Sequence, residues 1–340
     1  MTPPSGHGPK FESAVNVSPL GNNRYSAFLQ NAFCIGTVPH GGYTSAVLYR
    51  LALVHFATAH PDLYKGEPAT PISLHLTFLR RTSEGAATLR VHDVKLGKRT
   101  SSIHVELLQP KNVGKEVGEE GVEVKVVGYV TVSPASAEVG VSAKTDWELF
   151  PRPVAGSAGH DESAAGVDLS RLAQTGKDGP WVKLDPPFSE FRKATTQVEL
   201  YGVGAVEKKK LRNNGIVDQW ARLQPGGEVM RWSNEGLVFL TDMFPMALDV
   251  FDTIASDAEG GGPGATHWFP TVTLSIDLKK RLPVTGEEWL YSRVVTKDVR
   301  DGRTDLDVTI LDAKGEIVAL STQIGLVVSA SRNIGKRAKI

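Results

Sequence analysis

The predicted secondary structure of this chain occurs twice in the same order, and that repeat limits its fold more than any other feature. An apolar stretch with helical spacing runs over 41–59 and is ended by His60-Pro61, and a second apolar stretch runs from Trp232 to about Phe251. Four runs with the period of strands follow each stretch. A helix followed by antiparallel strands, duplicated, predicts an α+β protein with two antiparallel sheets, each wrapped around its own long helix. The predicted strands are 72–80, 86–96, 101–109 and 122–133 in the first repeat, and 272–280, 288–299, 304–311 and 316–328 in the second.

The two repeats also share short stretches of sequence in register. Residues 72–76 read Ile-Ser-Leu-His-Leu, and residues 272–276 read Val-Thr-Leu-Ser-Ile. We therefore predict an N-terminal repeat over 1–133 and a C-terminal repeat, with a C-terminal tail, over 191–340. Residues 134–190 are rich in Ala, Gly, Ser, Asp and Pro with little periodicity, which predicts an irregular linker.

Composition excludes several classes of protein. Lys and Arg together number 38, as do Asp and Glu, so the net charge of zero gives no electrostatic case for binding nucleic acid or an anionic membrane. Hydrophobic residues make up 41% of the 340 positions, enough for a sizeable core. Cys34 is the single cysteine, so an intrachain disulfide is excluded. Its apolar neighbours favour buried packing over a nucleophile.

Targeting features are found only at the C-terminus. The first ten residues lack the basic cluster and apolar run of a secretory signal, and the longest apolar stretches, such as 126–132, are far shorter than the ~20 residues of a membrane span. The chain ends in Ala338-Lys339-Ile340, a conservative variant of the Ser-Lys-Leu peroxisomal address. We expect an intracellular protein, peroxisomal if the address is read and cytoplasmic if these residues are only a basic tail.

Several common catalytic motifs are missing. No Gly-x-Ser-x-Gly occurs, so the run His40-Gly41-Gly42 is not the oxyanion loop of a serine hydrolase with a nucleophile elbow. The glycines at 202–204 and 260–264 complete no nucleotide-binding loop. The nine histidines lack His-Glu-x-x-His or another metal-ligand spacing. We expect chemistry that uses no cofactor and no metal.

Superposing the two helices suggests one composite site. A shift of 193 residues aligns Tyr49 with Asp242. The first helix begins with glycines, so the backbone N–H groups of Gly41, Gly42 and Tyr43 are candidates to bind substrate and a developing oxyanion. The second carries Asp242 in an apolar stretch, where a carboxylate is costly without partners. Together the halves make one site; the plainer interpretation is an ordinary helix start and a surface Asp242.

These residues resemble the acyl-CoA thioesterase II family and the broader thioesterase-like proteins. The resemblance implies a double hotdog fold and hydrolysis of acyl-CoA to a free acid and coenzyme A, with no covalent intermediate and no cofactor. It covers both repeats and leaves out the linker. The segments that carry it are His40-Gly41-Gly42, 73–80 and 97–100 in the first half, and Thr241-Asp242, Thr273, 288–291 and 320–323 in the second.

The family's catalytic residues correspond to Asp242, Thr273 and Gln323. The resemblance implies that these three groups hold and activate a water that attacks the thioester carbonyl. Asp242 is then the general base, with a pKa raised by apolar surroundings. The N–H groups of Gly42 and Tyr43 are expected to polarise the carbonyl.

Basic pairs at matching places in the repeats are candidates to contact the phosphates of coenzyme A, although solvated strand ends are the more usual explanation. They are Arg80, Arg81, Lys280 and Arg281.

Three functions remain open at this point. The first is an acyl-CoA thioesterase, acting in fatty acid metabolism if the chain is peroxisomal. The second is a hotdog thioesterase that acts on a carrier-bound or secondary-metabolite thioester. The third is an acyl-CoA-binding protein without turnover, with Met243 marking a decayed site. The sequence permits both a monomer and a homo-oligomer.

The C-terminal address gives a direct prediction. When Ala338-Lys339-Ile340 are deleted from a fusion with an N-terminal fluorescent protein, we expect the fusion to leave the peroxisomes and spread through the cytosol. Fluorescence microscopy against a peroxisomal marker measures the change. A truncated fusion that stays where the full-length fusion lies contradicts the prediction.

Overall fold

The computed structural model of the chain describes residues 10–111, 121–157, 163–185, 188–204, 215–245, 247 and 267–329. Three predicted features lie outside these ranges: the end of the second helix at 248–251, the glycine-rich loop at 260–264, and the tail with Ala338-Lys339-Ile340.

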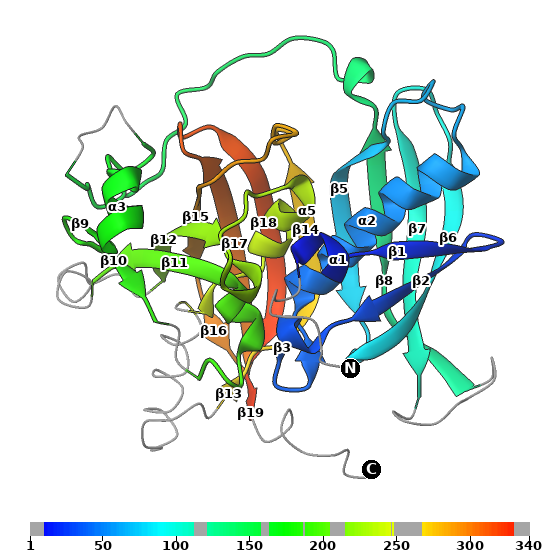
Figure 1. Cartoon of the computed structure of the whole chain (residues 1–340), viewed down its shortest axis with the longest axis horizontal. Coiled ribbons are helices and arrows are strands. Elements are labelled where there is room, and N and C mark those ends of the chain that lie inside the picture. The colour runs from blue at the N-terminus through cyan, green and yellow to red at the C-terminus, as the bar shows by residue number, and fades with distance from the viewer. Residues whose placement is uncertain are drawn as a thin grey trace, which may run out of the picture.

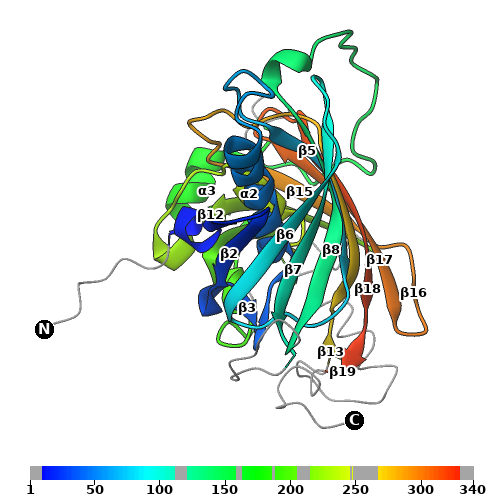
Figure 2. The ribbon, with the colours of Figure 1, turned by 90° about the vertical axis from the view of Figure 1, so that its right-hand side faces the viewer.

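The first predicted helix is confirmed as α2 (Gly41–Ala59). The Nδ1 atom of His40 accepts a hydrogen bond from the Gly42 N–H at 3.2 Å and so caps one of the free donors of the first turn. The helix ends at His60, directly before Pro61. Figure 2 shows α2 along one side of the strands of the first half. The helix is buried along most of its length, in agreement with its largely apolar sequence.

The four predicted strands of the first repeat are confirmed within two residues at each end. Four N-terminal strands that were not predicted precede the helix, with a short helix, α1 (Phe11–Ala14), before them. The strands are β1 (Val17–Gly21), β2 (Arg24–Leu29), β3 (Cys34–Ile35), β4 (Val38–Pro39), β5 (Thr70–Phe78), β6 (Gly85–Lys95), β7 (Ser101–Pro110) and β8 (Val122–Ser133).

The second half contains the other four predicted strands and additional short ones. The strand predicted over 288–299 is divided in two, and β11 and β12 precede the helix of this half without having been predicted. The strands are β11 (Val198–Val203), β12 (Ile216–Leu223), β13 (His267–Trp268), β14 (Thr271–Leu278), β15 (Leu290–Val295), β16 (Val299–Arg300), β17 (Arg303–Asp312), β18 (Ile317–Leu326) and β19 (Val328–Ser329).

The predicted long second helix needs correction. Helix α5 (Asn234–Leu240) has only seven residues, and Thr241 and Asp242 form a turn behind it. Pro245 gives a physical reason, because proline donates no backbone hydrogen bond and disfavours helical geometry in the residue before it. Asp242 therefore lies just past a helix end and not in the middle of a helix.

The prediction of two sheets, one for each half, is wrong, because the long strands of both halves join into one main sheet, while β3 pairs with β4 and β13 with β19 outside it. Strand β5 pairs antiparallel with β14, and His75 lies opposite Ser275. These two residues occupy equivalent positions in the repeats, so the pairing has a local twofold symmetry. Figure 1 shows β5 and β14 side by side near the middle of the molecule. The order of the sheet is β1-β2-β6-β7-β8-β5-β14-β18-β17-β15-β12-β11-β10-β9, with β16 paired to β17; its last two strands are β10 (Trp181–Leu184) and β9 (Lys177–Asp178).

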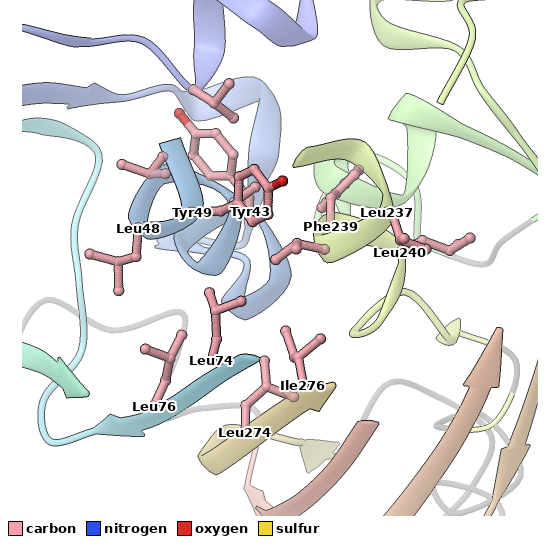
Figure 3. Packing of buried hydrophobic residues seen from close by; sticks show 14 of the residues in the cluster. Tyr43, Leu48, Tyr49, Leu74, Leu76, Leu237, Phe239, Leu240, Leu274 and Ile276 are labelled. Atoms are coloured by element: carbon pink, nitrogen blue, oxygen red, sulfur yellow. The ribbon is translucent and has the colours of Figure 1, made fainter. Parts of the chain in front are cut away.

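One main core lies between this sheet and the two helices. Leu74 of β5 and Ile276 of β14 are opposite one another and almost fully buried. Figure 3 shows them pointing toward Tyr43 of α2 and Phe239 of α5. Because both helices pack on the strands at the junction, the two halves share a continuous core.

The segment 134–190 contains regular elements in its second part, which its composition does not predict. It contains α3 (Leu169–Thr175), β9 (Lys177–Asp178) and β10 (Trp181–Leu184), and the two strands extend the main sheet. Its apolar side chains pack with Trp220 and Tyr291 in a second buried cluster. Neighbouring Ala221 and Leu290 belong to the main core, so this part of the sheet is covered on both faces. The boundary at residue 190 stays a prediction.

No helix within the described ranges is both long enough and apolar enough to cross a membrane.

The shared sheet predicts that the halves unfold together. All six tryptophans lie at or beyond residue 147, so their fluorescence reports on the second half and on the segment before it. Leu89 is fully buried in β6 of the first half, and Leu89→Ala is expected to lower the free energy of unfolding by about 2–5 kcal/mol. We expect the tryptophan transition in urea to move to lower denaturant by the same amount as the far-UV circular dichroism transition.

Leu20→Ala, the same substitution at an exposed position of β1, is the control and should change the free energy of unfolding by less than about 0.5 kcal/mol. A tryptophan transition that stays in place in Leu89→Ala would show that the halves unfold independently.

Candidate active site

Asp242 lies where the end of α5 meets the start of α2. Its Oδ2 atom accepts a hydrogen bond from the Gly42 N–H at 2.8 Å, although the two residues are 200 positions apart. The side chain is only 7% exposed. The composite arrangement predicted from the repeats is therefore present as geometry: the helix start comes from the first half and the carboxylate from the second.

The two glycines permit this close approach. A Cβ atom on Gly41 would lie 2.6 Å from Asp242 Oδ2, and one on Gly42 would lie 2.5 Å from the Phe239 carbonyl oxygen. Both distances are shorter than van der Waals contact, so any larger residue would push the helix start and the carboxylate apart. The glycines thus serve the contact between the halves.

Two further polar side chains surround the carboxylate. Thr271 Oγ1 lies 3.4 Å from Asp242 Oδ1 and 3.3 Å from Gln323 Oε1. Gln323 is 4% exposed, and its Nε2 atom has no hydrogen-bond partner within the described part of the chain. A buried donor without a partner is costly, so this N–H group is available to a bound molecule.

Thr273 is not part of this group, and Thr271 occupies its expected place. Pairing of β14 with β18 shifts between Thr271 and Thr273, so Val272 is an extra residue that reverses the alternation of side chains. Thr271 consequently faces the same side as Gln323. The resemblance had pointed to Thr273, and the shift in pairing, which no pattern along the strand reveals, places Thr271 beside Asp242 in its stead.

Burial controls the charge of the site. Desolvation raises the pKa of Asp242, and the nearby His40 and the hydrogen bond from the Gly42 N–H oppose that rise. Burial also lowers the pKa of His40, which weakens the positive charge that its imidazole can offer to Asp242. Its Nδ1 atom lies 3.6 Å from Asp242 Oδ2, too far for a hydrogen bond. The result is a carboxylate that is more basic than an exposed one.

One of the predicted oxyanion donors is occupied, and the Tyr43 N–H stays a prediction. The Gly42 N–H is already bound to Asp242 and His40. The Tyr43 hydroxyl donates to the Ala14 carbonyl oxygen at 2.7 Å, and its side chain anchors the N-terminal segment. Gly41 does line the pocket described next, but the structure gives Gly42 the role of orienting the carboxylate.

A pocket of about 260 Å³ opens beside Asp242. Both halves of the chain contribute to it, and most of its wall is apolar. Its apolar lining includes Ile35, Val38, Pro39, Phe78, Leu79, Phe191, Met243, Phe244, Trp268, Phe269, Pro270, Val272, Leu306 and Leu326.

Only half of the predicted basic residues lie at this pocket. Arg80 and Arg81 line it, and Arg81 stacks over the Trp268 ring at 5.4 Å. Lys280 is instead bound to Asp312 and Glu316, and Arg281 to Glu138, away from the pocket lining. The sequence analysis did not single out Arg192, which also lines the pocket.

The position that the repeat relates to the Asp242 site has no such polar group. The register of the repeats places Tyr49, Pro71 and Val130 where the second half has Asp242, Thr271 and Gln323. There Glu235 at the start of α5 forms an ion pair with Arg50 at 2.9 Å. The duplicated fold therefore carries one polar site of this kind.

Cys34 lies outside the pocket lining and is fully buried. Desolvation raises the pKa of its thiol to about 12, so it stays protonated and is no nucleophile.

Family models match both halves of the chain. The acyl-CoA thioesterase N-terminal domain matches residues 29–133, and the acyl-CoA thioesterase C-terminal domain matches residues 169–327. The chain belongs to the acyl-CoA thioesterase family. It is also 30% identical to the thioesterase-like protein TwmA of Talaromyces wortmannii, over 96% of this chain and 94% of that protein. Membership identifies the protein as a thioesterase-type hydrolase.

Solved structures of the family share the fold. A protein of Thermobifida fusca assigned as a thioesterase II is 21% identical, with a TM-score of 0.64 over 94% of this chain and 97% of that chain. The acyl-CoA thioesterase II TesB2 of Mycobacterium marinum is 16% identical, with a TM-score of 0.58 over 95% of this chain and all of that chain. A hot dog fold protein from Alicyclobacillus acidocaldarius is 14% identical, with a TM-score of 0.63 over 94% and 97%.

The raised pKa of Asp242 predicts that its charge weakens the fold. Because the folded state disfavours the carboxylate, Asp242 costs stability in full above its folded pKa. The cost falls as the pH drops toward the lower pKa of the unfolded chain and is absent below that value. Asp242→Asn keeps an oxygen that accepts from Gly42 and is expected to unfold at higher urea than wild type at pH 8. The difference should shrink as the pH falls through the Asp242 pKa.

Asp218→Asn is the contrasting control. Asp218 accepts two hydrogen bonds from Arg293, both at 2.7 Å, and its loss leaves a buried guanidinium unpaired, which costs about 3–5 kcal/mol. Equal loss of stability in both variants would contradict the electrostatic account of Asp242.

Proposed function

We propose that the protein hydrolyses acyl-CoA thioesters to a free acid and coenzyme A through a water activated by Asp242. One observation carries the proposal: Asp242 and Thr271 stand beside a buried Gln323 Nε2 that lacks a partner, at the wall of a largely apolar pocket. Three polar groups with an unused donor are suited to hold one water molecule against a bound thioester.

The reaction follows from these positions. Asp242 accepts a proton from the water while the water oxygen bonds to the thioester carbon, giving a tetrahedral intermediate with a negatively charged oxygen. The intermediate collapses, the carbon–sulfur bond breaks, and the thiolate of coenzyme A leaves with the electron pair. Thr271 and Gln323 hold the water in position, so the water loses little further translational and rotational entropy on reaching the transition state. No residue is acylated, in agreement with the protonated state of Cys34.

The Gly42 N–H group fixes the base. Its hydrogen bond holds Oδ2 of Asp242, which leaves Oδ1 toward Thr271. A carboxylate anchored at one oxygen keeps its other oxygen in a defined direction, and the raised pKa makes that oxygen a stronger base.

The pocket supports an acyl-CoA as the substrate. Its apolar wall suits a fatty acyl chain, and Arg80 and Arg81 suit the phosphates of coenzyme A. We infer a role in fatty acid metabolism from this pairing. The location in peroxisomes stays a prediction from the sequence, as does any homo-oligomer.

Release of free coenzyme A from short- to long-chain acyl-CoAs tests the proposal. Asp242→Asn should lower kcat/KM by about 10²-fold or more, the usual effect of removing a general base. Thr271→Val, which removes one hydroxyl, should lower it about 10-fold.

In wild type, kcat/KM should fall at low pH with a midpoint above the ordinary Asp pKa of 3.8.

Thr273→Val is the matched control and should stay within about 2-fold of wild type, since Thr273 faces away from the site. Full activity in Asp242→Asn would overturn the assigned base. Hydrolysis of a carrier-bound thioester alone would favour secondary metabolism, and acyl-CoA binding without release would favour a binding protein.

A further inference from the structure

A second group of reactive side chains lies at the far end of α2. His55 is in the last turns of the helix, His60 caps its C-terminus, and Asp93 comes from β6. Thirteen residues separate Gly42 from His55, about 20 Å at the rise of an α-helix, so this group is distinct from the site of Asp242.

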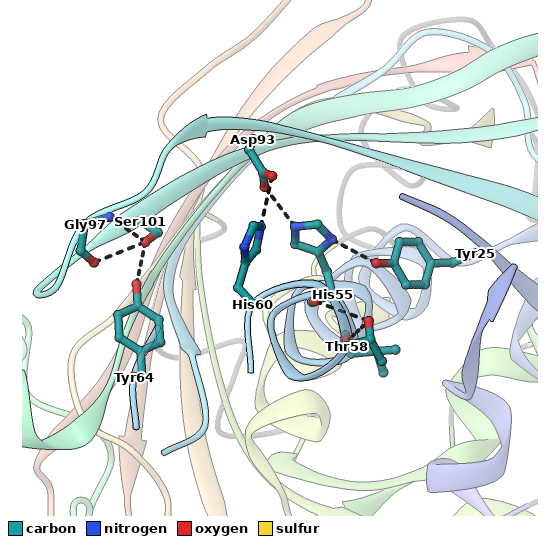
Figure 4. A network of polar contacts seen from close by, with 9 residues as sticks. Tyr25, His55, Thr58, His60, Tyr64, Asp93, Gly97 and Ser101 are labelled. Carbon is teal, nitrogen blue, oxygen red and sulfur yellow. Dashed lines mark hydrogen bonds and ion pairs between the residues drawn. The ribbon is translucent and has the colours of Figure 1, made fainter. Parts of the chain in front are cut away.

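The three side chains converge on one point. Asp93 Oδ1 lies 2.9 Å from His55 Nε2, and Asp93 Oδ2 lies 2.9 Å from His60 Nε2. One donor atom from each of the three residues lies within 4.8 Å of the other two. Figure 4 shows both imidazole rings pointing at the carboxylate of Asp93. An ion with ligand distances near 2.0–2.2 Å needs only small side-chain movements to bind all three.

A buried partner orients the most enclosed ligand. His55 is completely buried, and its second ring nitrogen, Nδ1, lies 2.8 Å from the hydroxyl of Tyr25, itself 3% exposed. Metal-binding histidines commonly use the other nitrogen in this way, because a proton on Nδ1 leaves the Nε2 lone pair for the ion. His60 and Asp93 are partly exposed, which leaves the ion a path from solvent.

We propose that His55, His60 and Asp93 form a binding site for a divalent transition-metal ion, with Zn²⁺ as the ion that they match best. Two imidazole nitrogens and one carboxylate oxygen are a known ligand set for Zn²⁺, and water completes the tetrahedron. The ion joins the end of α2 to β6. The proposal departs from the expectation of no metal site: His55 and His60 are five residues apart and the third ligand comes from a strand, so the spacing of histidines along the sequence does not reveal the group.

A second histidine group serves as a comparison. His92, His104 and Glu106 also lie close together, but on the exposed face of β6 and β7. His92 is 58% exposed, and Glu106 is already bound to Arg90. With no buried partner to orient a ring, this group is the weaker candidate and provides a control.

Metal titration of an untagged, chelator-treated chain tests the proposal. We expect one Zn²⁺ per chain by equilibrium dialysis and mass spectrometry, and a visible absorption band of tetrahedral geometry when Co²⁺ replaces it. His60→Ala should weaken Zn²⁺ binding by roughly 100-fold or more, and Tyr25→Phe by about 10-fold through the orientation of His55. His104→Ala should bind as wild type does.

His60→Cys guards against loss of folding as an explanation. A thiolate is also a zinc ligand, so this variant should regain tight binding and give a sulfur-to-cobalt charge-transfer band. Circular dichroism confirms that each variant is folded. The proposal is overturned if wild type binds no Zn²⁺ tightly, if His60→Ala binds equally well, or if binding is lost in His104→Ala. Preference for Fe²⁺ over Zn²⁺ would overturn the choice of ion.

Discussion

The pairing of β5 with β14 is the interaction on which the rest of the structure depends. His75 and Ser275, equivalent residues of the two repeats, lie opposite each other, so the strand hydrogen bonds join two half-sheets into one. The helices of both halves then pack on the same junction and share its core. This shared packing brings the end of α5 against the glycines that begin α2. The geometry of the proposed active site is a consequence of how the halves join.

A fold with local twofold symmetry creates two equivalent positions, and the sequence has made them different. At one, Asp242, Thr271 and Gln323 form a polar group beside a pocket. At the other, the corresponding residues are Tyr49, Pro71 and Val130. A duplicated chain can change each copy separately, which identical subunits of a homodimer cannot do. The asymmetry lets one position be optimised for chemistry while the other contributes packing.

Burial of the Asp242 carboxylate lowers the stability of the fold and raises the basicity of the side chain. Water would solvate Asp242 better than the pocket does, so the ionised side chain costs folding free energy. The same desolvation makes it a stronger base, and the Gly42 N–H keeps it in place. Functional sites commonly contain a destabilising group of this kind, and favourable packing elsewhere in the protein offsets its cost in folding free energy. Here the apolar packing in the shared core of the two halves offsets that cost.

The sequence by itself determined the repeat, α2, the eight predicted strands, and the meeting of Asp242 with the helix start at Gly41 and Gly42. Local periodicity and a comparison of the repeats contain that information. Tertiary structure alone decided the single sheet, the short α5, the choice of Thr271 over Thr273, and the group of His55, His60 and Asp93. Strand pairing, a bulge at Val272 and contacts between distant elements are hydrogen-bonding and packing relations between segments. A pattern read along one segment cannot contain them, because their energies depend on which other segment lies opposite.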